Sequence, residues 1–194
     1  MRRTRPARIF STALITTGLM IAGDVAVTLA WQEPLSSIAG WWKQRQATNQ
    51  LEQLEREFTA AAPEVGPRLG RGEATRLAGR FAGNLETGKA IGRLEIDAVD
   101  IDYTMVEGTD TSSLRNGPGH FPDTVLPGER GTMAVAGHRT TYLAPFKEVD
   151  DIEEGDRAVV EMPYGRFTYE FEKQLIVEPT RIGVVRDVDT IAWS

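Results

Sequence analysis

The stretches GRLEI (Gly92–Ile96) and VDIDYTMVEG (Val99–Gly108) decide the fold class, because apolar and polar residues alternate along both. A period of two is typical of strands that bury one face and leave the other in water. We therefore predict two half-buried β-strands here, near the middle of a chain of 194 residues.

The residues that follow predict more strands. DRAVVEMPYGRFTYEFEKQLIVEP (Asp156–Pro179) predicts a hairpin that turns at Pro163–Gly165, with Phe167, Tyr169 and Phe171 sharing one face. The apolar run TMAVAG (Thr132–Gly137) predicts a further short strand. Several short strands with Gly/Pro turns indicate an all-β sandwich or small barrel.

Two intervening segments lack this alternation. GPGHFPDTVLPGERG (Gly117–Gly131) is rich in Gly and Pro and predicts a long ordered loop, whereas APFKEVDDIEEGD (Ala144–Asp156) predicts one short helical turn.

The N-terminus predicts a membrane anchor. Arginines dominate residues 1–8, and the apolar segment Ile9–Trp31 follows. A helix of this length, rising about 1.5 Å per residue, just crosses a bilayer core of about 30 Å. We predict a cytoplasmic basic tail (1–8), a single-pass signal-anchor in the cell membrane (9–31) and an extracytoplasmic remainder. Asp24 weakens the span, and a cleaved signal peptide or a buried helix of a soluble protein stay open as alternatives.

Residues 32–87 predict a helical stalk or linker ahead of the main domain, 88–194. Leu51, Leu54 and Phe58 share one helical face, and the composition from Ala60 to Gly88 then turns to Ala, Gly, Arg and Pro.

Charge and composition limit the function classes. From Gly92 onward the chain has 20 acidic and 10 basic residues, a net charge of −10, which argues against nucleic acid as a partner. The absence of cysteine excludes disulfides, thiolate metal sites and thiol catalysis within the printed sequence. We expect no cofactor.

His138 is the first candidate site residue, because it follows a strand and a glycine at the start of a loop. A histidine in this position is usually a structural hydrogen-bonding residue, and the residues alone leave both interpretations open. Arg139 is either a ligand for a carboxylate or a surface cation beside an acidic domain.

Other chemistry lacks support in the sequence. His120 and His138 have no metal-ligand spacing, and Asp150–Asp156 lacks the order of ligands of an EF-hand, so we predict no metal and a solvated acidic turn. A serine hydrolase using Ser112, Ser113 or Ser194 has no motif behind it.

The ordered motifs resemble the sortases, most closely the actinobacterial class E type with class D as neighbour. The resemblance rests on GRLEI, VEGTD, GPGHFPDTVLPGERGTMAVAGHRTTYLAPF and IEEGDRAVVEMPYGRFTYEF, and covers roughly Gly88 to Val188. It implies an eight-stranded β-barrel and a cysteine transpeptidase. In such an enzyme a thiolate attacks the Thr–Gly carbonyl of an LPXTG- or LAXTG-like sorting signal of a secreted protein, and an amine of the cell-wall precursor resolves the acyl-enzyme.

By this resemblance His138 falls on the catalytic histidine, which protonates the leaving amine and deprotonates the incoming one. We predict Arg139, Thr140 and His120 as substrate-binding residues. Arg139 is the neighbour of the histidine in the motif and not the distal catalytic arginine.

The resemblance also implies a cysteine and an arginine after VVRDV (Val184–Val188), where this sequence continues as DTIAWS. We therefore expect a barrel without its last strands, poor folding of the isolated chain and no transpeptidase activity. The competing explanations are a truncated or frameshifted reading frame and a pseudo-enzyme that binds sorting signals without cleaving them.

Overall fold

The computed structural model describes residues 14–24, 34–61 and 70–178. Residues 14–24 are helical with exposed side chains, and they belong to a different compact unit (1–38) from the main body (39–194). Within the described ranges no helix combines the length and the apolar character needed to span a bilayer. The predicted anchor, 9–31, extends past the described helix on both sides, so the anchor stays a prediction.

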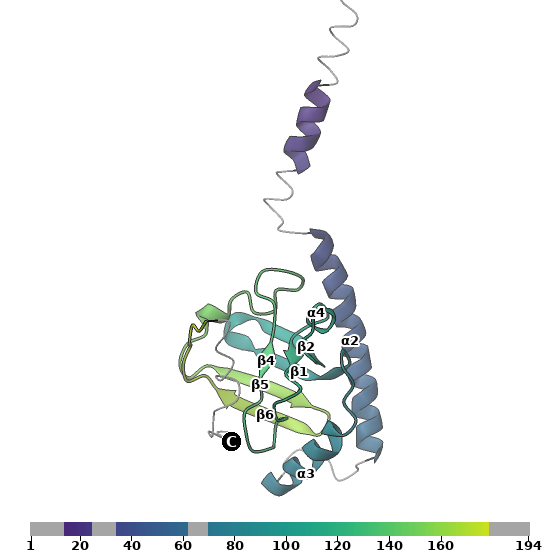
Figure 1. Cartoon of the computed structure of the whole chain (residues 1–194), viewed down its shortest axis with the longest axis vertical. Coiled ribbons are helices and arrows are strands. Elements are labelled where there is room, and N and C mark those ends of the chain that lie inside the picture. The colour runs from purple at the N-terminus through teal and green to yellow at the C-terminus, as the bar shows by residue number, and fades with distance from the viewer. Residues whose placement is uncertain (1–13, 25–33, 62–69, 179–194) are drawn as a thin grey trace, which may run out of the picture. The chain divides into compact units, whose positions relative to one another are not determined.

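The main body is built on one antiparallel-rich sheet (Figure 1). Its six described strands lie in the order β4-β3-β2-β1-β5-β6. The strands are β1 (Ala90–Ile96), β2 (Ile101–Glu107), β3 (Gly119–His120), β4 (Val135–Ala136), β5 (Arg157–Met162) and β6 (Gly165–Glu170). The strands predicted from alternation are confirmed as β1 and β2, and the predicted hairpin is confirmed as β5–β6, where Met162 pairs with Gly165.

The connections explain the order of the strands. A short 3₁₀ turn, η1 (Asp97–Val99), and Asp100 in the left-handed region at φ 50° reverse the chain between β1 and β2. Strand β3 pairs with β2 in parallel, and β4 pairs with β3 antiparallel. The predicted short helical turn appears as η2 (Val149–Asp151), and a one-turn helix, α4 (Thr111–Leu114), precedes β3.

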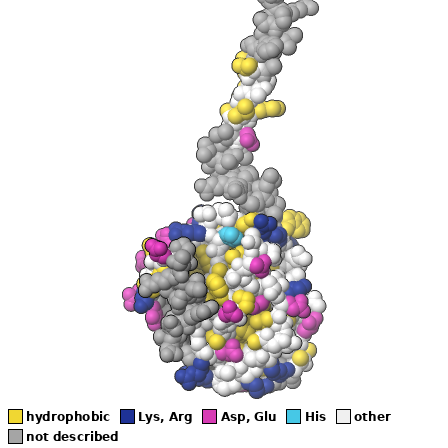
Figure 2. All heavy atoms as spheres, in the orientation of Figure 1, with side chains coloured by type: hydrophobic (Ala, Val, Ile, Leu, Met, Phe, Trp, Pro, Cys, Tyr) yellow, Lys and Arg dark blue, Asp and Glu magenta, His cyan; other side chains and the backbone are white. Residues whose placement is uncertain are grey.

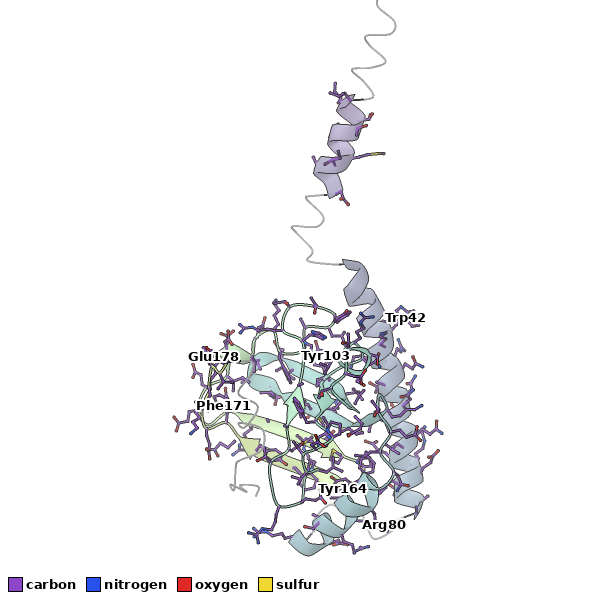
Figure 3. The ribbon with its side chains drawn as sticks, in the orientation of Figure 1. Trp42, Arg80, Tyr103, Tyr164, Phe171 and Glu178 are labelled. Carbon is purple, nitrogen blue, oxygen red and sulfur yellow. The ribbon has the colours of Figure 1, made fainter. Side chains whose placement is uncertain are left out.

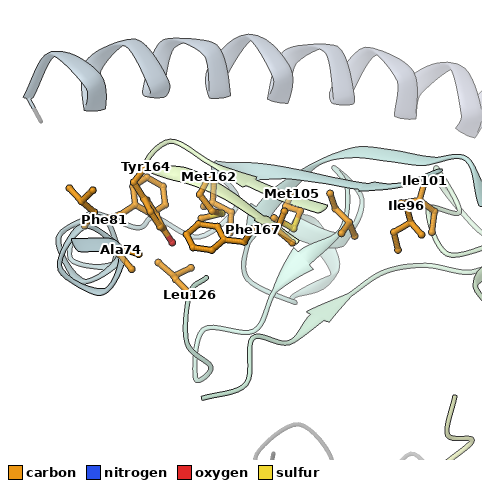
Figure 4. Close-up of a cluster of buried hydrophobic side chains, with 14 of the residues drawn as sticks. Ala74, Phe81, Ile96, Ile101, Met105, Leu126, Met162, Tyr164 and Phe167 are labelled. Carbon is orange, nitrogen blue, oxygen red and sulfur yellow. The ribbon is translucent and has the colours of Figure 1, made fainter. Parts of the chain in front are cut away.

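Two helices correct the all-β prediction. Helix α2 (Pro34–Ala61) runs along the strands, and α3 (Arg71–Ala82) lies at one end of the core (Figures 1 and 4). The segment expected to be a stalk therefore packs on the domain through its apolar side chains. Leu51 is buried, and Leu54 and Phe58 pack against the core, as their shared face predicted.

The core lies where α3 meets the hairpin and the loop before β4 (Figure 4). Phe81 of α3 contacts Tyr164 at 5.6 Å between ring centroids, and Tyr164 contacts Phe167 at 5.8 Å. The buried Tyr164 hydroxyl donates to the Pro127 carbonyl at 2.9 Å, which satisfies its polar end. Burial holds the pKa of Tyr164 well above its usual range.

The sheet is a curled half-barrel whose edge strands in the described chain are β4 and β6. The face drawn in Figure 2 shows hydrophobic side chains reaching the surface between acidic ones. The expectation of an incomplete eight-stranded barrel is supported only as far as a β-rich, open sheet. The helices that pack on this sheet were not predicted to be part of the domain.

Candidate functional site

The candidate site begins where β4 ends. The chain passes from Ala136 through Gly137 to His138, and the carbonyl of His138 accepts a hydrogen bond from the Phe146 amide at 3.2 Å. A side chain at position 137 would meet the Phe146 ring, since a Cβ at this position would lie 2.6 Å from Phe146 Cδ2. The glycine therefore lets the Phe146 ring pack directly against the backbone where the loop folds back at His138.

His138 has one occupied and one free ring nitrogen. Nδ1 lies 3.2 Å from the Thr141 hydroxyl, whereas Nε2 is buried and has no hydrogen-bond partner among the residues that the structure describes. Buried polar atoms normally have partners, and an exception calls for an explanation. A nitrogen without a partner in the described chain can accept or deliver a proton once a bound molecule reaches it.

Aromatic contacts position the His138 ring. Tyr142 lies against it at 4.8 Å between centroids, with the planes tilted by 54°. Tyr142 adopts φ 56°, a left-handed conformation that non-glycine residues rarely adopt. The Arg115 guanidinium lies over the Tyr142 ring, 5.1 Å from its centroid.

A residue of strand β2, Tyr103, contacts the same loop. The Tyr103 hydroxyl donates to the Leu143 carbonyl at 3.3 Å. Partial burial, followed by the negative charge of Asp102, raises the pKa of Tyr103, so this phenol keeps its proton at neutral pH.

Arg139 contacts a different neighbourhood from His138. Arg139 forms an ion pair with Asp150 of η2, and Gln174 donates to the same carboxyl group at 3.1 Å. Arg139 is thus an exposed cation that pairs with a carboxylate of the same domain. Thr140 is exposed. A substrate-binding role for either residue stays a prediction.

His120 is placed very differently. Its side chain lies in β3, and Nδ1 is 2.8 Å from the Glu107 carboxylate, with only 1% of His120 and 5% of Glu107 exposed. On the other side of the ring, Nε2 lies 3.1 Å from the Thr124 hydroxyl and 3.3 Å from the Val125 carbonyl. Both nitrogens therefore have protein partners, and the predicted role of His120 in substrate binding requires at least one of these contacts to open.

Thr124 connects the His120 ring to the neighbouring backbone. The Thr124 hydroxyl donates to the Phe121 carbonyl at 2.8 Å and accepts from the Ala134 amide at 3.2 Å, so its one proton is already used. His120 Nε2 then faces only acceptors, and Nδ1 faces a carboxylate. The Glu107–His120 pair is therefore a buried cross-link between β2 and β3, and it is held on its far side by Thr124 and Val125.

Metal binding finds no support in the described residues, where no group of three or more His, Asp or Glu side chains could hold an ion. In the acidic segment, Asp150 pairs with Arg139 and Asp156 accepts from the Glu153 amide at 2.8 Å, as in an ordinary polar turn. A cavity of about 660 Å³ lies between α2 and the α3–β1 connection, but none of its lining residues belongs to the His138 loop.

Sequence reasoning missed three residues of these two neighbourhoods. Tyr142 stood in the motif around His138 without being singled out, and Arg115 and Glu107 carried no signal of their own. Glu107 lies 13 positions from His120, and only the parallel pairing of β2 with β3 brings the two together.

The chain is similar to known proteins over most of its length. A family model for the sortase domain matches residues 94–192, which include His138. Sortase D of Bacillus subtilis (strain 168) is 32% identical over 173 residues, covering 89% of this chain and 78% of that protein. Sortase SrtE2 of Streptomyces coelicolor is 30% identical, covering 82% of this chain, while the chain spans 61% of that protein's length.

A solved structure shares the fold. The chain resembles a Clostridium perfringens sortase D5 transpeptidase with a TM-score of 0.58 at 22% identity, covering 76% of this chain and 82% of that one. Together with the family match over half of the sequence, these likenesses establish that the chain belongs to the sortase family.

Proposed function

We propose that this domain is part of a membrane-anchored sortase-type cysteine transpeptidase, with His138 as its proton-transfer group. The observation that carries the proposal is the buried Nε2 of His138, which lacks a partner in the described chain and lies inside the segment matched by the sortase family model. The fixed Nδ1 contact to Thr141 supports it by holding the ring in one orientation.

The proposed reaction has two steps. A thiolate attacks the Thr carbonyl carbon of an LPXTG- or LAXTG-like signal, the C–N bond breaks, and the leaving amine takes a proton from His138. An amine of the cell-wall precursor then loses a proton to His138 and attacks the thioester, so the C–S bond breaks and the thiolate is released. Proton transfer of this kind contributes about 10²–10⁴-fold to the rate.

The printed sequence supplies the histidine but no thiol. We therefore propose that a polypeptide of these 194 residues does not cleave the signal by itself. The absence of cysteine also favours a second candidate, a sortase-fold domain that binds the sorting signal without cleaving it. The membrane location, with the N-terminal tail in the cytoplasm, rests on the basic and apolar pattern of residues 1–31.

The test starts from the protein isolated from the membranes of its own cells. Its intact mass is measured, and it is incubated with LPXTG and LAXTG peptides and an amine acceptor while the products are followed by mass spectrometry. The proposal expects cleavage and amine transfer only if the isolated polypeptide carries a cysteine, and expects His138→Ala to abolish both.

The polypeptide of the printed sequence is the matched control. It is expected to give no cleavage product, and peptide titration then separates the two candidates, because a binding domain retains the peptide. Cleavage by this thiol-free chain would contradict the proposed chemistry, and full activity of the His138→Ala protein would contradict the role of the histidine.

A further inference from the structure

The N-terminal part of α2 carries two large aromatic side chains that the domain leaves uncovered. Trp41 is 53% exposed and Trp42 is 65% exposed. Trp42 lies on the side of α2 that faces away from the sheet (Figure 3). Two adjacent exposed tryptophans represent a large uncovered apolar area, and such patches usually mark an interaction surface.

The opposite side of the same turns is fixed to the domain. The Gln44 amide donates to the Thr104 and Asn116 carbonyls at 3.0 and 2.6 Å, and its oxygen accepts from the Thr104 amide at 2.8 Å. Gly40 lies against Leu143, since a Cβ added to this glycine would sit 2.6 Å from the Leu143 side chain. These contacts set the rotation of the helix, so the two tryptophans are held facing outward.

Positive charge accompanies the tryptophans. The Arg45 guanidinium lies 5.2 Å from the Trp41 ring centroid, and the two indoles meet edge to face at 5.7 Å. Between Pro34 and Leu51 the helix carries Lys43 and Arg45 and no acidic residue, in contrast to the net charge of −10 from Gly92 onward. Tryptophan with lysine or arginine is the composition that favours the headgroup layer of an anionic bilayer.

We propose that Trp41, Trp42, Lys43 and Arg45 form a docking patch for the surface of an anionic lipid bilayer. The indole rings enter the headgroup layer, where an apolar body and an N–H donor are both accommodated, and the two cations contact lipid phosphates. The acidic remainder of the domain is repelled by the same surface, so the patch is the side that approaches it.

This inference rests on the proposed membrane location, and the chain length allows it. The predicted anchor ends at Trp31 and α2 begins at Pro34, so Trp41 lies about two helical turns, or about 10 Å, along the helix from its start. Because Gly40 contacts the loop that follows His138, docking also fixes how the candidate site faces the membrane.

The test uses the full chain reconstituted into vesicles of phosphatidylcholine and phosphatidylglycerol with brominated acyl chains, which quench nearby indoles. Of the four tryptophans, Trp31 and Trp193 are replaced by phenylalanine, so that emission comes from Trp41 and Trp42. Flotation of the vesicles reports membrane association, and quenching reports docking of the patch.

The proposal expects flotation with strong quenching. Lys43→Gln and Arg45→Gln should each lower the ratio of docked to undocked patch about fivefold. Arg56→Gln, a matched loss of an exposed cation on the same helix, should leave quenching unchanged. Vesicles of phosphatidylcholine alone should also reduce quenching.

Several outcomes would overturn the proposal. A chain that floats without quenching would contradict the docking patch but not the membrane location. A chain that does not float would contradict both. Quenching that is insensitive to lipid charge and to both substitutions would overturn the role of the cations. A concentration-dependent blue shift without vesicles would assign the patch to a second copy of the chain instead.

Discussion

The two histidines of this chain lie near neighbouring strands and illustrate two uses of one side chain. His120 in β3 is buried, and both ring nitrogens contact protein groups. His138 follows β4, with one nitrogen near Thr141 and the other without a partner in the described chain. The difference shows that the surroundings, not the residue type, separate a structural cross-link from a group that can exchange protons.

The strongest test of this contrast compares how much each histidine contributes to the free energy of unfolding. Glu107→Ala should lower the free energy of unfolding by about 3–5 kcal/mol, because it removes one partner of a buried His–Glu pair. His138→Ala should cost less than about 1 kcal/mol, since its ring makes no buried ion pair. Urea unfolding of both full-length variants measures the difference, and equal losses would break the comparison.

A second test concerns the glycines that precede the two histidines. Gly119→Ala should cost about 2–3 kcal/mol, because its Cβ would lie 2.2 Å from the Gly108 carbonyl oxygen and the backbone must move. Gly137→Ala should cost about 1 kcal/mol, since the Phe146 ring can shift. Thermal unfolding followed by circular dichroism ranks the two, and the reverse ranking would contradict the tighter packing of the His120 region.

The threonines beside the histidines allow a smaller, matched test. Thr124→Val removes an acceptor from the Ala134 amide and from His120, so a loss of about 1–2 kcal/mol is expected. Thr141→Val alters an exposed contact to His138 and should change stability by about 0.5 kcal/mol or less. Urea midpoints that agree between the two variants would argue against the assignment of roles.

A smaller effect than that of Thr124→Val is expected at Tyr103, which joins β2 to the loop after His138. Tyr103→Phe removes the bond to the Leu143 carbonyl and should cost about 0.5–1 kcal/mol. Because the folded state raises the pKa of Tyr103 above 10.0, the unfolded chain ionises first and stability falls as the pH rises above that value.

Stability measured across this alkaline range should therefore decline less steeply in the Tyr103→Phe variant than in the parent protein. An identical decline would show that the Tyr103 phenol is not buried in solution.

Local patterning accounts for the part of the fold that the sequence predicted. Strands β1 and β2 and the β5–β6 hairpin follow from alternation and a Pro-Tyr turn, both of which act between neighbouring residues. The two-residue strands β3 and β4 depend on pairing with distant partners, such as Val106 with Gly119, which no local pattern contains.

The helices and the site also combine features that local sequence predicts with features that depend on distant contacts. Helix α3 was not predicted to enter the core, because its Ala- and Gly-rich sequence carries few large apolar residues. Leu77 and Phe81 are buried there through contacts with distant parts of the chain, such as that of Phe81 with Tyr164. His138 was predicted from its motif, whereas the contact of Arg115 with Tyr142 beside it and the Glu107–His120 pair depend on tertiary contacts.

The central claim, that a sorting signal meets His138 and leaves His120 untouched, can be tested on the two histidines directly. The full chain labelled at its two imidazoles gives one set of ring signals for each histidine in nuclear magnetic resonance spectra, assigned with His138→Ala. Titration with an LPXTG or LAXTG peptide should shift the His138 signals and leave those of His120 in place. Signals that both stay unchanged at saturating peptide, or a shift confined to His120, would contradict the account.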